Sequence, residues 1–296
     1  MATLKEVKLK ISAVKKTKQI TKAMNMVAAS RLRGAQTRME GFRPYAAKFE
    51  EVLGNLAQSA GDQSSPLLLA REETKRTHIM LCTSDRGLCG GFNANLIDKA
   101  AKLAKQKAAQ GIKVSFTAFG KRGRDWMRRE KATMVDQHIG VVGSTFSFNV
   151  ASQSGRKMVS DFLNQEIDEV IIVYAEFLSM AKQVPVTKQL LPIPPMERPE
   201  AAADENAPYL AEHITEPSPE ALLGEILPKS VDVQIYRALL ETSTSEHAAR
   251  MMAMDNATKA CNDMIQNLTL AYNKARQAAI TGELMDIVGG AEALKG

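Results

Sequence analysis

The sequence is poor in cysteine and in long apolar runs, and each shortage excludes a class of protein. Three cysteines occur in 296 residues, Cys82, Cys89 and Cys261, and no two of them form a CxxC pair. This excludes a disulfide framework and a zinc site built on cysteine pairs, and it favours a reducing compartment. The longest strongly apolar run covers residues 170–175, far fewer than the ~20 residues that cross a bilayer as a helix.

Patterns typical of catalysis and ligand binding are missing as well. The four histidines (His78, His138, His213 and His247) are scattered and show no metal-ligand spacing. The glycine-rich stretch at residues 83–93 follows a predicted strand, but it matches neither GxGxxG nor GxxxxGK[ST]. A tight strand-to-helix turn with close backbone packing explains it better. We therefore predict no catalytic residue, no metal and no cofactor, and a chain without an active site of its own.

What is present is a concentration of positive charge at the N-terminus. Residues 1–48 hold twelve Lys and Arg against Glu6 and Glu40, a net charge of +10 in a chain whose total is +6. Such an asymmetry predicts an acidic partner, which could be nucleic acid, anionic lipid or a protein surface. A basic coiled-coil nucleic-acid-binding protein is the alternative function. Against it, residues 5–38 contain no aromatic side chain for base stacking.

Both ends of the chain predict long helices. Apolar or small residues recur at steps of mostly three and four from Leu4 to Phe42, including Ile20 and Val27, and resume beyond Pro44, where we expect a kink. The predicted C-terminal helix begins near Ser218, an N-cap residue followed by a proline. Its predicted seam comprises Met254, Ala257, Cys261, Met264, Leu268, Ala271, Ala275 and Ala278. Because neither stripe can be buried alone, we expect the chain ends to pack on each other.

The middle of the chain changes to strand–helix alternation. Apolar, β-branched segments predict strands at residues 77–82, 113–119, 169–177 and 186–191, and helices are expected at 95–111 and 149–166. This order indicates an α/β domain with at least partly parallel pairing. The predicted organisation is an N-terminal helix over 1–60, a central domain over 75–195, a proline-rich linker over 196–217 and a C-terminal helix over 218–296.

Three blocks, residues 11–36, 83–96 and 280–293, resemble the gamma subunit of F-type ATP synthases, and the resemblance extends over essentially the whole chain. It implies an antiparallel coiled coil of the two chain ends and a central Rossmann-like α/β domain that binds no dinucleotide. It also implies the function of a central rotor stalk, which transmits torque between a proton-driven c ring and the catalytic hexamer. The subunit itself would be non-catalytic.

The resemblance further implies partners and a location. The expected partners are three alpha and three beta subunits, the epsilon subunit and the c-subunit ring, with no nucleic acid and with membrane contact only through the complex. The expected location is peripheral, on the cytoplasmic face of a bacterial inner membrane, since no transit peptide precedes the first block. The chloroplast-type thiol-switch insertion has no counterpart here. Residues 213–217 lack the tyrosine that some relatives carry near the c ring.

Six residues match positions that the family uses for partner contacts. Met24 resembles a methionine close to the acidic lever loop of a beta subunit, and Arg250 resembles the arginine that pairs with that loop. Four more residues resemble the polar contacts that hold the shaft to one catalytic subunit at a time: Arg276, Gln277, Thr281 and Glu283. The stretch 287–291 fits a small, apolar tip.

Overall fold

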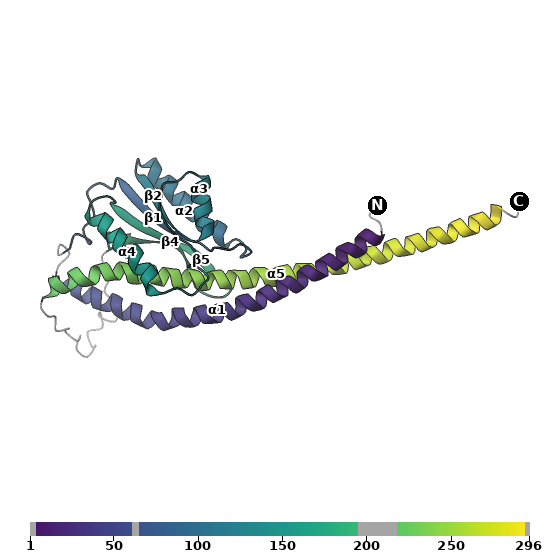
Figure 1. Cartoon of the computed structure of the whole chain (residues 1–296), viewed down its shortest axis with the longest axis horizontal. Helices are drawn as coiled ribbons and strands as arrows, with labels where there is room; N and C mark the ends of the chain where they lie inside the picture. Colours follow the sequence, from purple (N-terminus) through teal and green to yellow (C-terminus); the bar gives the residue numbers. More distant parts are fainter. Residues whose placement is uncertain (1–3, 61–64, 195–217, 294–296) are drawn as a thin grey trace, which may run out of the picture. The chain divides into compact units, whose positions relative to one another are not determined.

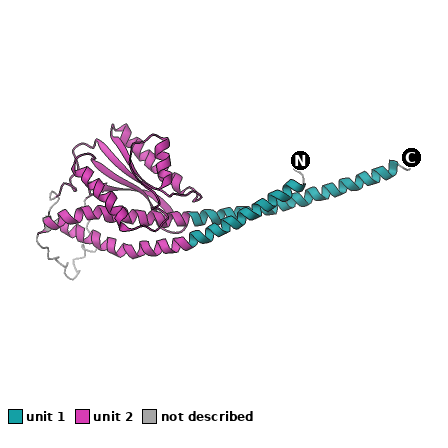
Figure 2. Cartoon of the chain, viewed as in Figure 1, with its two compact units in different colours: residues 1–29, 250–296 teal, residues 30–249 magenta. Residues whose placement is uncertain are grey.

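The computed structural model describes residues 4–60, 65–194 and 218–293, which divide into two compact units. One unit combines residues 1–29 with residues 250–296, and the other comprises residues 30–249 (Figure 2). The predicted linker at 196–217 and His213 lie outside the described residues. Two long helices at the ends of the chain contribute to both units: α1 (Leu4–Ala60) and α5 (Pro219–Ala293).

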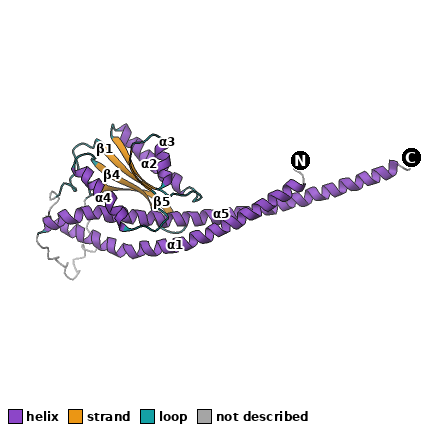
Figure 3. Cartoon of the chain, in the orientation of Figure 1, coloured by secondary structure: helices purple, strands orange, loops and turns teal. Residues whose placement is uncertain are grey.

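The larger unit contains one five-stranded sheet in the order β3-β2-β1-β4-β5 (Figure 3). Its strands are β1 (Arg76–Cys82), β2 (Lys113–Phe119), β3 (Met134–His138), β4 (Glu169–Phe177) and β5 (Gln183–Leu191). The first four in the sheet order are parallel, and β5 pairs antiparallel to β4. The predicted α/β class with partly parallel pairing is confirmed. Sequence reasoning missed β3, a short strand whose residues are half-buried or exposed and mostly polar.

Three shorter helices cover the two faces of the sheet: α2 (Phe92–Ala109), α3 (Lys121–Arg129) and α4 (Phe148–Leu163). Alternate side chains of β1 point to opposite faces, as a strand requires. Ile79 and Leu81 pack in one core with α2 and α3, whereas Met80 and Cys82 pack in another with α4. Figure 1 shows α2, α3 and α4 beside the sheet. Sequence reasoning missed α3, because five of its nine residues are basic.

Helix α5 begins where the sequence predicts, and neither long helix ends at its internal proline. Ser218 accepts a hydrogen bond from the Ala221 N–H to its Oγ at 3.3 Å, so it caps α5 as predicted. Helix α1 continues through Pro44, and α5 continues through Pro228. The helices at the two ends of the chain confirm the remaining part of the predicted fold class.

Within the larger unit, both long helices pack on the face of the sheet that α4 covers. Their buried contributions to that core include Leu53 of α1 and Leu227 and Ile235 of α5. An ionic network adds to it: Arg237 Nη1 lies 3.3 Å from Glu50 Oε1, and Arg237 Nε lies 3.2 Å from Glu241 Oε1. Burial, followed by the charge of Glu241, raises the pKa of Tyr174 of β4 to about 12.

A buried histidine in the sheet predicts loss of stability in acid. His78 Nδ1 lies 2.8 Å from Ser115 Oγ and Nε2 lies 2.9 Å from Thr117 Oγ1, and the residue is 1% exposed. Burial, then the charge of Lys157, lowers its pKa from 6.5 to about 4. Between these two values the unfolded chain binds the proton more readily than the folded chain does. The folded state therefore loses stability as the pH falls through this window, by roughly 3 kcal/mol in total.

The measurement is urea unfolding of the purified chain at several pH values between 7 and 4, compared with His78→Asn. We expect the wild-type chain to lose more stability over this window than the variant, because the variant has no imidazole to protonate. Parallel curves for the two proteins would contradict the prediction.

Candidate functional site

The smaller unit is an antiparallel pair of helical segments, residues 4–29 of α1 and 250–293 of α5. Thr21 Oγ1 and Thr258 Oγ1 lie 2.8 Å apart, and Asn25 Nδ2 donates to the Met251 carbonyl oxygen at 2.8 Å. The numbers rise along α1 as they fall along α5, so the two helices run in opposite directions. This pair contains all six residues that the family resemblance singles out.

Polar side chains occupy the seam of this pair on the α1 side. The seam continues from Val14 at steps of four, three and four through Lys18, Thr21 and Asn25, which are half-buried or buried. The prediction that Ile20 and Val27 belong to the seam is wrong, since they are 60% and 56% exposed. They lie one or two positions away from the row that faces α5.

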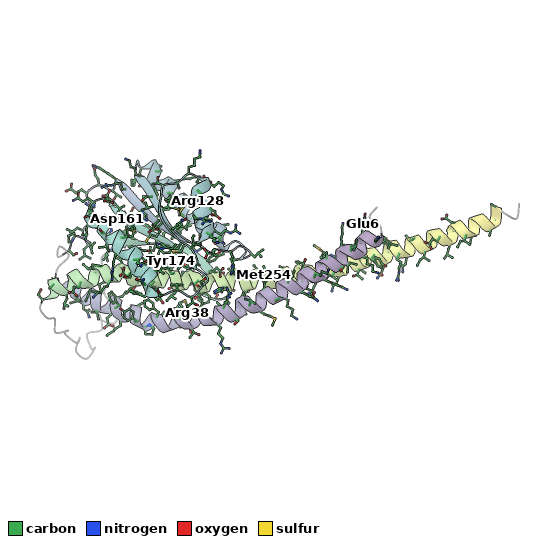
Figure 4. The ribbon with its side chains drawn as sticks, in the orientation of Figure 1. Glu6, Arg38, Arg128, Asp161, Tyr174 and Met254 are labelled. Carbon is green, nitrogen blue, oxygen red and sulfur yellow. The ribbon has the colours of Figure 1, made fainter. Side chains whose placement is uncertain are left out.

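On the α5 side the predicted seam is right in part. Met254, which is labelled in Figure 4, is buried. Ala257, Cys261, Leu268 and Ala275 are half-buried. Met264, Ala271 and Ala278 are instead exposed, and the half-buried Ile265 and Tyr272 take the places beside the first two. Ile265 is β-branched, unlike Met264, and Tyr272 is bulkier than Ala271. The phase of the helix turns both neighbours toward α1. Sequence spacing did not distinguish the adjacent positions.

The structure brings Met24 and Arg250 to the same level of the helix pair. Each is the sequence neighbour of a residue in the bond between Asn25 and the Met251 carbonyl. Both side chains are half-buried, so each keeps an accessible part. A methionine and an arginine at one level of the helix pair offer one adaptable apolar side chain and one positive charge.

The other four predicted residues form a separate group farther along α5. Arg276, Gln277, Thr281 and Glu283 are all exposed, as is every described residue from 276 to 293. Twenty-six residues separate Arg250 from Arg276, a distance of about 39 Å along a helix. The structure therefore does not place these four residues beside Met24 and Arg250 within the smaller unit.

Large apolar side chains are exposed on the same segment of α5. Ile280, Leu284, Met285, Ile287 and Val288 are 49%, 56%, 67%, 68% and 57% exposed. On α1, Leu9, Ile20, Met26 and Val27 are also exposed by more than half. Exposed apolar residues gathered on a helix mark a surface that a partner covers. Sequence reasoning anticipated the tip at 287–291 and missed the exposed apolar positions of α1, of which it assigned Ile20 and Val27 to the seam.

The glycine-rich turn at residues 83–93 bonds to itself and to neighbouring loops. Asn93 Oδ1 accepts the Ser84 N–H at 2.9 Å, and Asn93 Nδ2 donates to Ser84 Oγ at 2.8 Å. Asp85 accepts the N–H groups of Lys121 and Gly140 at 2.9 and 2.8 Å. These bonds support the interpretation as a tight structural turn.

The described part of the chain offers neither a metal site nor a membrane-spanning helix. Among residues 4–60, 65–194 and 218–293, no three His, Cys, Asp or Glu side chains gather in a way that could hold a metal ion. None of the helices in this part of the chain combines the length and apolar character needed to cross a bilayer.

Comparisons with known proteins agree over the full length of the chain. A family model described as ATP synthase matches residues 3–294. The ATP synthase gamma chain of Desulfosudis oleivorans is 63% identical over 298 residues and covers 100% of both chains. The ATP synthase gamma chain of Nitratidesulfovibrio vulgaris is 57% identical over 296 residues, again covering 100% of both.

Solved structures of rotary assemblies contain similar chains. One comes from the central stalk and c ring of the Tetrahymena thermophila mitochondrial ATP synthase, with a TM-score of 0.60 and 26% identity. The match covers 80% of this chain and 99% of that one. Another comes from the Euglena gracilis mitochondrial ATP synthase, in an assembly of OSCP, F1 and c ring. It has a TM-score of 0.67 and 19% identity over 98% of this chain and 94% of that one, and it shares the fold.

Proposed function

The chain belongs to the family of ATP synthase gamma chains, and from this premise we propose how its surfaces act in the rotor. It is a non-catalytic central-stalk subunit of a rotary ATP synthase. The observation that carries this conclusion is identity of 63% over the full length of a gamma chain. The alternative of a nucleic-acid-binding protein is not supported.

We propose contacts with three alpha and three beta subunits, the epsilon subunit and the c-subunit ring. The exposed basic side chains of α1 suit acidic surfaces on those partners, and the exposed apolar side chains of α5 suit the inside of a protein ring. This subunit is peripheral to the membrane, on the cytoplasmic face of a bacterial inner membrane. The chain meets the membrane only through its partners.

The proposed mechanism uses the two groups of predicted residues differently. Met24 and Arg250, at one level of the helix pair, face the acidic lever loop of a beta subunit. Arg276, Gln277, Thr281 and Glu283 hold one catalytic subunit at a time. Because a two-helix rod has unlike sides, chemically identical sites around it meet different contacts, and rotation changes their relative nucleotide affinities.

Met24→Lys tests this mechanism. The substitution places a second cation at the level of Arg250, where it attracts the acidic loop and adds an electrostatic well to the rotational path. We expect assembly and ATP hydrolysis to persist while ATP-driven proton pumping per ATP falls at least about twofold. The measurement is the ratio of pumping to hydrolysis in membrane vesicles that contain the complete ATP synthase.

Met24→Leu is the matched control, since it keeps an apolar side chain of similar volume and adds no charge. It should pump as the wild-type complex does. An undiminished ratio in Met24→Lys would overturn the assigned role of Met24. Complexes assembled without this chain that still pump protons would overturn the function as a whole.

A further inference from the structure

Seven consecutive polar residues of α5 are buried in the larger unit. Residues 241–247 read Glu-Thr-Ser-Thr-Ser-Glu-His, and none is more than 3% exposed. Consecutive residues of a helix point in different directions around its axis, so α5 is enclosed on all sides here. Buried polar groups are costly unless they find hydrogen-bond partners, and the positions of those partners show what this segment does.

Two hydroxyl groups of the segment bind both backbone groups of one residue at the end of β4. The Ala175 N–H donates to Thr242 Oγ1 at 3.3 Å, and Ser245 Oγ donates to the Ala175 carbonyl oxygen at 3.3 Å. Thr242 Oγ1 donates its own proton to the Ala238 carbonyl oxygen at 2.7 Å, which leaves its lone pairs directed at Ala175. Residues 242 and 245 lie three apart, on one side of the helix.

The pairing of the sheet explains why Ala175 needs these partners. The ladder between β1 and β4 ends at the pair Leu81 and Val173, two residues before Ala175. On the other side Ala175 is opposite Pro185 of β5, but the Ala175 N–H and carbonyl groups point away from β5, because both bind α5. Proline is tolerated at this edge strand because its nitrogen lies where no ladder bond is made. Helix α5 thus supplies the hydrogen bonds that no strand supplies.

These contacts lie at the carboxyl end of the sheet, where its strand order reverses. The chain passes from β1 to β2 and β3 on one side and returns to place β4 on the other side of β1. Open α/β sheets bind their ligands at this position. The loop after β3 also meets α5 there, because the Gly143 N–H donates to Ser243 Oγ at 3.2 Å. The chain's own helix occupies the place of a ligand.

We propose that Thr242 and Ser245 fix the rotational position of α5 on the sheet, so that torque passes between helix and domain through directional hydrogen bonds. Apolar contacts are non-directional and allow sliding. Turning the helix by about 30° moves an atom ~5 Å from its axis by about 2.6 Å, which a hydrogen bond does not tolerate. This inference rests on the proposed function as a rotor subunit. It names the residues that attach helix α5 to the sheet of the α/β domain.

The test compares the double variant Thr242→Val/Ser245→Ala with Thr244→Val in the complete ATP synthase. Thr244 is a matched control, because it is also fully buried and its hydroxyl bonds only to the Leu240 carbonyl oxygen of the same helix, at 2.9 Å. One measurement is hydrogen–deuterium exchange of the peptide that contains the Ala175 amide. The other is the ratio of proton pumping to ATP hydrolysis in membrane vesicles.

In the double variant we expect the Ala175 amide to exchange at least about tenfold faster and the pumping ratio to fall at least about twofold. Thr244→Val should match the wild-type complex, and Thr242→Ser with Ser245 intact should retain both properties. Unchanged exchange, an unchanged pumping ratio, or an equal loss in Thr244→Val would each overturn the proposal. If the double variant fails to assemble, Thr242→Val alone is measured against the same criteria, because Thr242 Oγ1 is the acceptor of the Ala175 N–H. The proposed function is tested separately, because it predicts proton pumping by the wild-type complex whatever these variants do.

Discussion

Gly120→Ala is expected to prevent the chain from folding, the largest effect that we predict for a single methyl group. Gly120 precedes α3 with φ +103°, and an added Cβ would lie 2.1 Å from the Thr83 carbonyl oxygen. Both sides of this contact are backbone held by hydrogen bonds, from the Gly120 N–H to the His138 carbonyl at 2.9 Å and from the Thr83 N–H to the Phe119 carbonyl at 2.7 Å. Neither can move without breaking hydrogen bonds at the carboxyl ends of β1, β2 and β3.

We expect Gly120→Ala to cost at least about 4 kcal/mol of unfolding free energy, because backbone strain and a steric clash add. The measurement is the yield of folded chain and its urea unfolding. Gly111→Ala is the matched control, since Gly111 also has a positive φ of +78° but no atom lies within 4 Å of the added Cβ. It should cost about 1 kcal/mol, the strain of a left-handed alanine alone. Equal losses for the two variants would contradict the steric argument.

Gly155→Ala is expected to have the second largest effect, because Gly155 lets α4 approach α5 closely. A Cβ at this position would lie 1.9 Å from Asp232 Oδ1 and 3.4 Å from the Asp232 Cα. The carboxylate must move, and it is buried at 6% exposure. We expect a loss of about 3 kcal/mol in unfolding free energy, at the upper end of typical overpacking costs.

Asp232→Ala should rescue this loss. The substitution removes the clashing carboxylate and leaves the Cα of residue 232 at ordinary contact distance. Burial raises the pKa of Asp232 to about 6, so at pH 8 its ionised form already opposes folding. We therefore expect Asp232→Ala alone to cost little at pH 8, and the double variant Gly155→Ala/Asp232→Ala to regain most of the lost stability.

The measurement is urea unfolding of the four proteins of this double-mutant cycle. Gly34→Ala is a further control within a helix, because nothing lies within 4 Å of its added Cβ. It should stabilise the chain by about 0.5–1 kcal/mol through helix propensity. Additive losses for Gly155→Ala and Asp232→Ala would show that the contact between the two residues is not the cause.

The sequence alone predicted the elements that local physics determines. The apolar steps of three and four predicted both long helices, and Ser218 followed by proline predicted where α5 begins. The β-branched apolar runs predicted four of the five strands. Strand β3 and helix α3 were missed because one is short and polar and the other is mostly basic, so neither carries a buried stripe of its own.

The candidate site was predicted less completely. The resemblance to gamma subunits named six residues, and the structure adds that Met24 and Arg250 come from one level of the helix pair, whereas the other four lie farther along α5. Their roles toward other subunits remain predictions. The exposed Ile20 and Val27 were assigned to the seam, because spacing of three or four residues fits adjacent rows equally well.

By itself, then, the sequence determined the family, the class of fold and the presence of two paired helices, since these follow from periodicity and from motifs. Only the tertiary structure decided which of two adjacent positions faces the partner helix, and which polar residues are buried. Thr242 and Ser245 resemble solvent-facing residues in sequence, yet they supply the bonds that the end of β4 lacks. The physical reason is that periodicity is a property of one segment, whereas a buried hydrogen bond needs two segments that meet only when the chain folds.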